Sequence, residues 1–406
     1  MSLSKFPLLE LPTVALNEVL KLFTPFEIIF FSFCSKRTKS ICQSIRLIPK
    51  SKEALCTFNV WINSVHAIYL QFTYFQPELW VFNLEKCPEQ KYPKRNKFWS
   101  VFPQGLLKMC YSRKPTTSSW EKMEKSIEGI HFSNWNPSVD TVHTYSWLTN
   151  GTTLTTRHSL HLYTSENLTS VTKKLVDHIS EIFHERVNAF GLEWNQYNSK
   201  ENLMIMDAFC NPVQDFQLTG DTSNDSSKND VLSSILKNQN AKETMTLWIN
   251  PSSDFSFDFS QFKNSFEILD ITYSHWITFQ NISDVRCVKL YLHKSNFLQA
   301  DFKLLIDKWR DGWTPNWKTM SIELNEDIDV DTCVDGEYID LEPENYKSRK
   351  VVCGNLPIQL NRFKGFFEGN CGAAFMHAYH ILRSDGCIAT IGIADDKYRV
   401  GWFHIR

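Results

Sequence analysis

Three aspartates in the last quarter of the sequence have the spacing of a calcium-binding loop. Asp327, Asp329 and Asp331 match the first, third and fifth ligand positions of such a loop. The sixth position needs Gly for a sharp turn and the twelfth needs a bidentate Glu. This sequence has Thr332 and Tyr338 there instead, so we predict a solvated acidic loop and no metal site.

The acidic character extends beyond these three residues. The stretch 323–344 holds ten acidic residues and neither Lys nor Arg. The alternative to a purely solvated loop is therefore a docking site for a basic segment of a partner protein.

Two pairs of histidines are spaced three residues apart, His158/His161 and His377/His380. In a helix each pair would share a face and could bind zinc. The segment 158–163, however, has the pattern of a strand, and no third ligand lies near either pair. We predict polar packing for both pairs, and no cofactor.

Cys371 lies in the segment Gly369-Asn-Cys-Gly372, which resembles the nucleophile segment of ubiquitin-like cysteine proteases. In those enzymes a lowered thiol pKa activates a Cys at the start of a helix. The step His275-Trp276 resembles their His-Trp step, but they also need a Gln shortly before the Cys. Here Gln359 is 12 residues away. We therefore expect a structural thiol, no catalytic residue and no enzymatic activity.

Composition excludes several other classes of function. The formal net charge is -2 and no basic-aromatic stripe is present, so we expect no nucleic-acid partner. No run reaches the roughly 18 apolar residues that a membrane span requires, and no signal sequence is evident. The 11 cysteines are scattered without metal-ligand spacing. We expect thiols in a reducing compartment, in the cytoplasm and/or the nucleus.

Three short helices are predicted near the N-terminus. Pro7 and Pro12 bracket an extended piece, and after it Leu16, Val19, Leu20 and Phe23 recur on one helical face, with Thr13 as the expected N-cap. The second helix should begin at Thr24-Pro25-Phe26-Glu27, a capping box with Pro in the first turn. A third should begin after Ser35.

The second of these helices is apolar on nearly every side, since only Glu27 and Ser32 are not apolar between Phe26 and Cys34. Three short helices cannot cover such a helix alone. Either the rest of the chain covers it or another protein does, and composition alone leaves both alternatives open.

The pieces FPLLELP, VL, TPFE and SFCSKR, in this order, resemble the F-box of the large nematode families over about residues 5–46. The resemblance implies insertion into the small adaptor subunit of SCF-type ubiquitin ligases, and through it attachment to a cullin. The apolar helix would then be buried against another protein. Phe33 stands where leucines are more usual, which we expect to change the fit of the surface rather than its function. The implied adaptor contacts are Pro7, Leu8, Leu11, Pro12, Leu16, Val19, Leu20, Ile28, Phe31 and Cys34.

The middle of the chain mixes strands and helices. Three short β-branched and aromatic segments predict strands over residues 55–82, and further strands are expected over 141–163. A helix should follow from 165 to about 186, with its apolar face at Leu168, Val171, Leu175, Ile179 and Ile182/Phe183. The stretch 219–242 is rich in Asn, Ser, Asp and Lys, and predicts a polar surface loop.

A rough repeat follows. Strands are expected at 246–249, 268–271, 288–292 and 319–324, with a helix over 300–310 before the last. Units of this period indicate a leucine-rich-repeat-like stack. The Asn ladders of such repeats are missing, so an ordinary α/β sheet domain is the alternative.

Residues 262–324 resemble the type 2 F-box-associated region that follows the F-box in the same nematode proteins, through HWITFQNISDVRCVKLYL, NFLQADFKLLIDKWRDG and WKTMSIEL. The segments HILRSDGCIATIGI and GWFHIR resemble that family's closing hairpin. Asp385-Gly386 is typical of a tight turn between two strands.

These observations predict an α+β protein with a small three-helix F-box and a mixed α/β body. The expected divisions are an F-box at 5–46, a mixed strand and helix region at 55–245, and an F-box-associated region with a C-terminal hairpin at 246–406.

We expect a substrate-receptor subunit of an SCF-type cullin ubiquitin ligase, which presents an unidentified target protein for modification by proximity and orientation. The alternatives are an F-box-containing binding protein with no degradative role and, third, a ubiquitin-like cysteine protease. Trp and Arg are enriched at interface hot spots. Arg310, Trp313 and Trp317 are therefore the predicted target-binding residues, with packing of both Trp against the core as the alternative.

Overall fold

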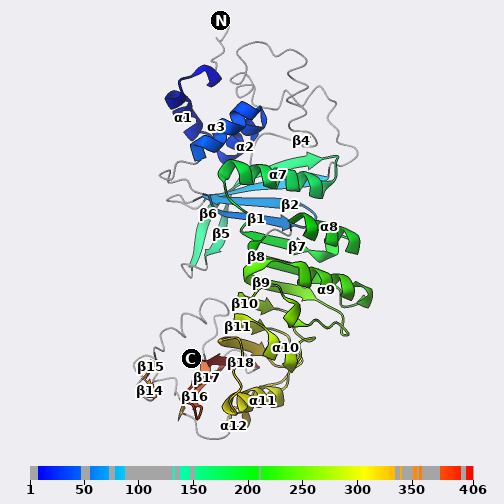
Figure 1. Cartoon of the computed structure of the whole chain (residues 1–406), viewed down its shortest axis with the longest axis vertical. Coiled ribbons are helices and arrows are strands. Elements are labelled where there is room, and N and C mark those ends of the chain that lie inside the picture. Colours follow the sequence, from blue (N-terminus) through cyan, green and yellow to red (C-terminus); the bar gives the residue numbers. More distant parts are fainter. Residues whose placement is uncertain are drawn as a thin grey trace. The chain divides into compact units, whose positions relative to one another are not determined.

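A computed structural model describes most of the chain (Figure 1). The described residues are 8–46, 55–72, 78–86, 131–132, 138–146, 151–209, 212–333, 339–340, 351–353, 356–358, 375–394 and 399–405. They form two compact units, residues 1–144 with 152–191, and residues 145–151 with 192–406. We call these unit 1 and unit 2 and describe each separately.

Unit 1 begins with the predicted helices, here called the N-terminal helix group: a 3-10 turn η1 (Leu8–Glu10), α1 (Thr13–Lys21), α2 (Pro25–Phe33) and α3 (Lys36–Arg46). Two details differ from the sequence prediction. Residues 8–10 form a helical turn instead of an extended piece, because only the residue directly before a proline is kept from helical geometry. Thr13 is the first helical residue, and Pro12 takes the cap position without a side-chain hydrogen bond.

The start of α2 has the predicted capping box. Thr24 N donates to Glu27 Oε2 over 2.8 Å, and Glu27 N donates to Thr24 Oγ1 over 3.3 Å. At the start of α3, Ser35 and Thr38 exchange equivalent bonds of 2.9 and 3.1 Å. Both helix starts are thus fixed by local side chains, as the sequence predicted.

The sheet of unit 1 has the strand order β7-β1-β2-β3-β6-β4, with β5 paired to β6. Strands β1, β2 and β3 form an antiparallel meander, β6 is parallel to β3, and β4 is antiparallel to β6. The predicted strands are confirmed. Their bounds are β1 (Leu55–Ile62), β2 (His66–Phe72), β3 (Glu78–Lys86), β4 (His131–Phe132), β5 (Ser138–Ser146), β6 (Gly151–Thr164) and β7 (Ala189–Glu193).

Helix α7 (Leu168–Phe183) packs on this sheet against β2 and β3, and every residue of its predicted apolar face is buried. Its start is capped by Asn167, whose Oδ1 accepts from Ser170 N over 2.9 Å. Beneath the helix lies His66, fully buried, with Nδ1 2.7 Å from Thr172 Oγ1. The Thr172 hydroxyl donates to Leu168 O, so His66 Nδ1 carries a hydrogen and donates to Thr172. Burial lowers the pKa of His66 to about 4.

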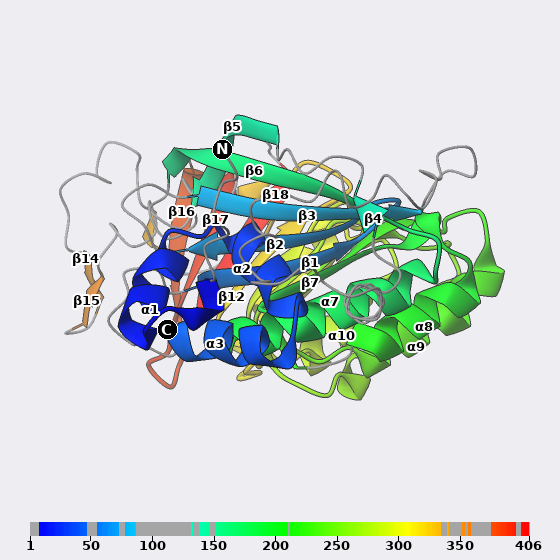
Figure 2. The ribbon, with the colours of Figure 1, turned by 90° about the horizontal axis from the view of Figure 1, so that it is seen from above.

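Unit 2 is built on five parallel strands in sequence order: β8 (Val213–Asp221), β9 (Ala241–Asn250), β10 (Phe266–Ile271), β11 (Cys287–Leu292) and β12 (Thr319–Glu323). They are joined by α9 (Asn229–Asn238), the 3-10 turn η4 (Phe259–Gln261), α10 (Phe279–Asp284) and α11 (Gln299–Arg310). Helix α8 (Ser199–Phe209) precedes β8 and packs against α9, and in Figure 2 α8, α9 and α10 lie on one side of the strands.

Helix α9 replaces the polar loop that was predicted over 219–242, which was wrong. Leu232, Ile235 and Leu236 are fully buried and form an apolar stripe at helical spacing. The polar residues between them lie on the outer side, so average composition concealed an amphipathic helix. The same segment contains a short 3-10 turn, η3 (Ser226–Lys228).

An apolar row runs across the middle of this sheet. Each side chain is paired with its neighbour in register, and none is more than 2% exposed. The row consists of Phe216, Met245, Leu269, Leu290, Met320 and Phe403.

Just after the strands, a ladder of buried hydroxyl groups joins neighbouring repeats. Thr222 Oγ1 donates to Asn250 O over 3.5 Å, Ser274 Oγ to His293 O over 2.7 Å, and Ser295 Oγ to Glu323 O over 2.5 Å. In each case the backbone N–H of the same residue donates to the carbonyl that accepts from its hydroxyl group. Hydroxyl groups therefore tie the ends of neighbouring strands together at three places in this sheet.

Beyond β12 the sheet becomes antiparallel, in the order β12-β18-β17-β16-β13. These strands are β13 (Ile339–Asp340), β16 (Phe375–Leu382), β17 (Ile388–Ala394) and β18 (Val400–Ile405); β14 (Val351–Cys353) and β15 (Leu356–Ile358) form a separate pair, and α12 (Val330–Cys333) follows β12. The predicted turn between β16 and β17 is confirmed, with Gly386 at a φ of 87°. Gly401 is required because a Cβ there would lie 2.7 Å from the Phe302 ring of α11.

Arg383 fastens this hairpin to the end of α11. Its side chain is buried, its Nη1 donates to Trp309 O and Trp313 O over 3.3 and 3.1 Å, and its guanidinium lies over the Trp309 ring. Asp385 accepts two further bonds from it, of 3.0 and 2.7 Å. The guanidinium thus bonds one carbonyl group in the last turn of α11 and one just beyond the helix, where a cation is favourable.

The predicted fold class is confirmed: three N-terminal helices precede a mixed α/β body. The units divide the chain at 144/145, 151/152 and 191/192. The expected boundary at 245/246 lies inside β9, where the ladder with β8 and β10 continues. No helix among the described residues is both long and apolar enough to cross a membrane.

Replacing Arg383 with Lys should destabilise unit 2, because an ammonium cannot form the forked bonds to two carbonyls and a carboxylate. We expect a loss on the order of 2 kcal/mol, measured as the free energy of unfolding in urea. Arg399→Lys is the matched control, since its pair with Asp327 is largely exposed. Equal losses in both variants would contradict the role of Arg383.

Unit 1 should lose stability as the pH falls from about 6.5 to about 4. In this range the unfolded chain protonates His66 at its ordinary pKa, whereas the folded chain does so only near the lowered value of about 4. Acid therefore favours the unfolded form. His66→Gln should make the free energy of unfolding, measured by urea titration between pH 7 and 4.5, depend less steeply on pH. The same steepness as in the wild type would contradict the role of His66.

Candidate protein-interaction surfaces

Helix α1 divides its apolar residues between the interior and the surface. Leu16 and Leu20 are 5% and 0% exposed, whereas Val14 and Leu22 on the opposite side are 76% and 82% exposed. Pro12, just before the helix, is also exposed. Exposed aliphatic side chains on one short helix make this side of α1 a candidate for contact with another protein.

The predicted adaptor contacts lie in three different environments. Leu11 and Val19 are half-buried and Pro12 is exposed, so these three are accessible together with Val14 and Leu22. Cys34 is half-buried. Pro7 lies outside the described residues. The remaining predicted contacts are buried inside the chain, at 5% exposure or less: Leu8, Leu16, Leu20, Ile28 and Phe31.

The apolar residues of α2 are covered by the chain itself. Phe26 contacts Trp80 and Phe82 of β3 edge to face, with ring centroids 5.0 and 4.8 Å apart. Every residue from Ile28 to Phe31 is at most 1% exposed. The expectation that another protein covers α2 was therefore wrong, because β3 and α7 lie within reach and fill that role.

The predicted target-binding corner is only partly accessible. Trp317 is 1% exposed, and its Nε1 donates to Ile282 O over 3.1 Å. Its ring packs on Phe403 with centroids 5.6 Å apart. Trp313 is half-buried between Trp317 and Phe279, and Arg310 is half-buried as well. Trp317 is thus a core residue. Trp313 and Arg310 remain partly accessible to solvent.

The residues that could have formed catalytic or metal sites have other roles where they are described. Asp327 pairs with Arg399 Nε over 3.0 Å, and Asp329 accepts from Thr332 Oγ1 over 2.7 Å. Within the part of the chain that the structure describes, no cluster of His, Cys, Asp and Glu could hold a metal ion.

The histidines of the pair 158/161 lie on opposite faces of β6, as their spacing in a strand requires. His158 stacks on Trp80 with centroids 4.0 Å apart, and His161 Nδ1 is 3.3 Å from Glu85 Oε1. His377 and His380 lie on β16. Cys371 lies outside the described residues.

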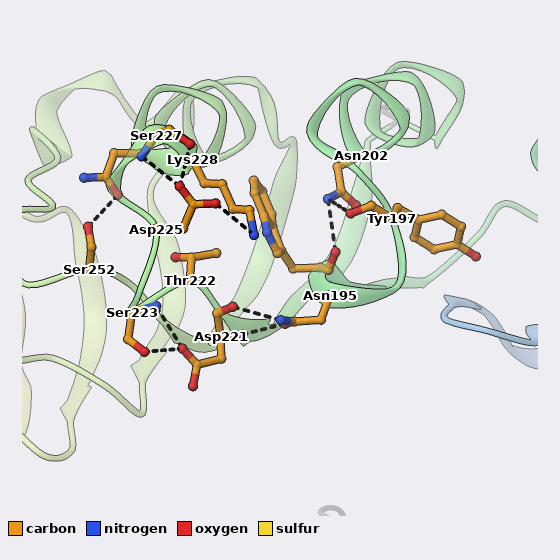
Figure 3. Close-up of polar contacts among 12 residues, drawn as sticks. Asn195, Tyr197, Asn202, Asp221, Thr222, Ser223, Asp225, Ser227, Lys228 and Ser252 are labelled. Atoms are coloured by element: carbon orange, nitrogen blue, oxygen red, sulfur yellow. Dashed lines mark hydrogen bonds and ion pairs between the residues drawn. The ribbon is translucent and has the colours of Figure 1, made fainter.

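The carboxyl end of β8 carries a dense polar network, drawn in Figure 3. Asp221 Oδ1 accepts from the backbone N and the Oγ of Ser223 over 2.8 and 2.6 Å, and Asn195 Oδ1 accepts from Asp221 N over 2.6 Å. Asp225 repeats the pattern with Ser227 at the start of η3. Bonds from the serines hold the pKa of both aspartates below its usual range. These groups close turns and cap helices, which gives the network a structural role.

Val14 and Leu22 escaped the sequence analysis because they lie off the apolar stripe of α1. That stripe identifies the face that packs inward, so the opposite face was taken as ordinary surface. The signal was present in the sequence: two aliphatic residues stand where an amphipathic surface helix normally carries polar ones.

Residues 8–50 match the F-box domain. No curated protein and no solved structure matches the chain. The F-box domain supports a general role in binding the adaptor of SCF-type ligases, and it coincides with the N-terminal helix group.

Proposed function

We propose that this chain is a substrate-receptor subunit of an SCF-type cullin ubiquitin ligase, which binds the adaptor through α1 and a target protein through its body. The observation that supports it is the exposure of Val14 and Leu22, at 76% and 82%, on an F-box domain. Together with Leu11, Pro12 and Val19 they form what we call the α1 patch. A receptor of this kind contributes proximity and orientation, and the chemistry takes place on the conjugating enzyme.

The α1 patch suits an apolar groove in the adaptor. Burying each aliphatic side chain of this size contributes about 1.5–3 kcal/mol, and a few such anchors dominate most interfaces. The only ion pair found on α1 among the described residues, Lys21 with Glu18, is exposed and lies beside the patch in sequence. It contributes little by itself, as expected of a surface pair.

The double substitution Val14→Asp and Leu22→Asp should abolish adaptor binding, because two carboxylates would have to be desolvated in an apolar groove. Binding of the purified adaptor subunit to the full-length chain, by calorimetry, provides the measurement. We expect a loss of at least about 100-fold in affinity, as for the removal of two interface anchors.

Val139→Asp is the matched control, since Val139 is 60% exposed on β5 and lies outside the patch. It should bind the adaptor as the wild type does. Undiminished binding by the Val14/Leu22 variant would refute the α1 patch as the docking surface.

For the body, we propose that residues 262–324 and the closing hairpin form a type 2 F-box-associated region of the nematode kind. The support for this proposal is that strands β10, β11 and β12, helix α11 and the β16–β17 turn are formed by the residues that carry the resemblance. We assign target binding to unit 2, with Trp313 and Arg310 as contributing residues. We further propose that the chain itself is not an enzyme and acts in the cytoplasm and/or the nucleus.

Trp313→Ala should weaken capture of the target while leaving the melting temperature nearly unchanged, because Trp313 is only half-buried. Trp317→Ala should instead lower stability by about 3–5 kcal/mol, as for other buried Trp residues. Quantitative affinity capture, compared with thermal unfolding of the same variants, separates the two effects. Unchanged capture by Trp313→Ala would remove this corner from the target-binding surface.

A further inference from the structure

The F-box domain is packed into the body through residues that lie away from the α1 patch. Phe26 inserts its ring between those of Trp80 and Phe82 on β3, and its exposure is 1%. Helices α2 and α3 also contact α7 directly, as Figures 1 and 2 show. The F-box helices thus share one core with the sheet and helix α7 of unit 1.

His178 forms the polar part of this contact. Its Nε2 lies 2.6 Å from Ser32 Oγ on α2, and its ring stacks on Phe33 with centroids 3.8 Å apart and planes 12° apart. The Ser32 hydroxyl donates to Ile29 O over 2.5 Å. Its hydrogen is therefore engaged, so His178 Nε2 carries a hydrogen and donates to Ser32.

A third contact follows one turn later on α7. Lys39 of α3 pairs with the Glu181 carboxylate, and Gln43 Nε2 donates to Glu181 O over 3.2 Å. A ring stack, a partly buried hydrogen bond and a charge pair therefore lie along one edge of α7, and all of them are made with α2 and α3.

The α1 patch is connected to this edge through α2. Phe23 lies just after α1 and packs edge to face on Phe31, with ring centroids 5.7 Å apart. Phe31 belongs to α2 and is buried. A helix as apolar as α2 keeps its place only while all of its sides are covered. The position of α1 therefore depends on the cover that β3 and α7 give to α2.

We propose that His178 and Phe26 are positioning residues for adaptor binding: they hold the F-box helices in the binding conformation although neither belongs to the α1 patch. The adaptor affinity of this chain then depends on its body. This inference rests on the proposed function for its binding readout, and hydrogen exchange of the F-box helices tests it independently.

The experiment compares full-length wild type with His178→Ala, His178→Gln and Lys174→Ala. Gln can place a hydrogen-bonding group near Ser32. The Gln variant should therefore keep most of the adaptor affinity and amide protection that the Ala variant loses. Lys174 is the control on the same helix, with a side chain that is 64% exposed. Phe26→Leu is a second, milder variant that keeps an apolar side chain on β3.

For His178→Ala we expect roughly tenfold weaker binding of the purified adaptor, about the effect of losing one intramolecular hydrogen bond. Amide exchange in α1–α3 should be faster, with the protection of β1 and β2 unchanged. Phe26→Leu should act in the same direction, and His178→Gln and Lys174→Ala should behave nearly as wild type.

Unchanged exchange in α1–α3 for both His178→Ala and Phe26→Leu would overturn the proposal, as would an equal loss of protection throughout unit 1. If the wild type fails to bind the adaptor, the proposed function is refuted, and exchange in α1–α3 still decides whether α7 holds the F-box helices.

Discussion

Helix α2 has no side that it can present to water, and unit 1 is arranged around that constraint. Its two polar side chains are both engaged: Glu27 closes the capping box with Thr24, and Ser32 bonds Ile29 O and His178. The remaining residues are apolar and need contact on all sides. α1 and α3 supply part of that contact, and β3 and α7 supply the rest.

This arrangement separates two tasks within a very small domain. α2 provides the core that joins the F-box helices to the sheet, and α1 provides the accessible apolar residues. Leu16 and Leu20 hold α1 down while Val14 and Leu22 face outward. Among the described residues, one side of α1 is therefore packed against the rest of unit 1, and the other carries exposed aliphatic side chains.

Most of the correct sequence predictions concern local structure. The capping box at Thr24, the apolar stripe of α7 and the Asp-Gly turn at residue 385 each depend on residues a few positions apart, so they can be recognised without a structure. The errors arose where the decisive partner is far away in sequence. Phe26 meets Trp80 and Phe82, and Trp317 meets Phe403, across more than 50 residues in each case.

Of the candidate surfaces, the sequence predicted the region of α1 but not the side of it that remains accessible. Burial inside the chain excludes Ile28 and Phe31 from the accessible surface, and only the tertiary packing of α2 reveals this. Helix α9 was missed for the opposite reason, since its stripe of Leu232, Ile235 and Leu236 was visible in the sequence and average polarity was weighed above it. The hydroxyl ladder was overlooked because Ser and Thr are common enough to attract no notice.

The hydroxyl ladder and the apolar row of unit 2 share one property. Each hydrogen bond of the ladder and each side-chain pair of the row joins only neighbouring strands. Stability in such an array is a sum of terms between nearest neighbours, as in a one-dimensional chain of coupled segments. A substitution in one repeat then weakens that repeat and the two beside it, while more distant repeats keep their protection. Exposed positions on β8 to β12 can accordingly change one repeat at a time without loss of the fold beneath them.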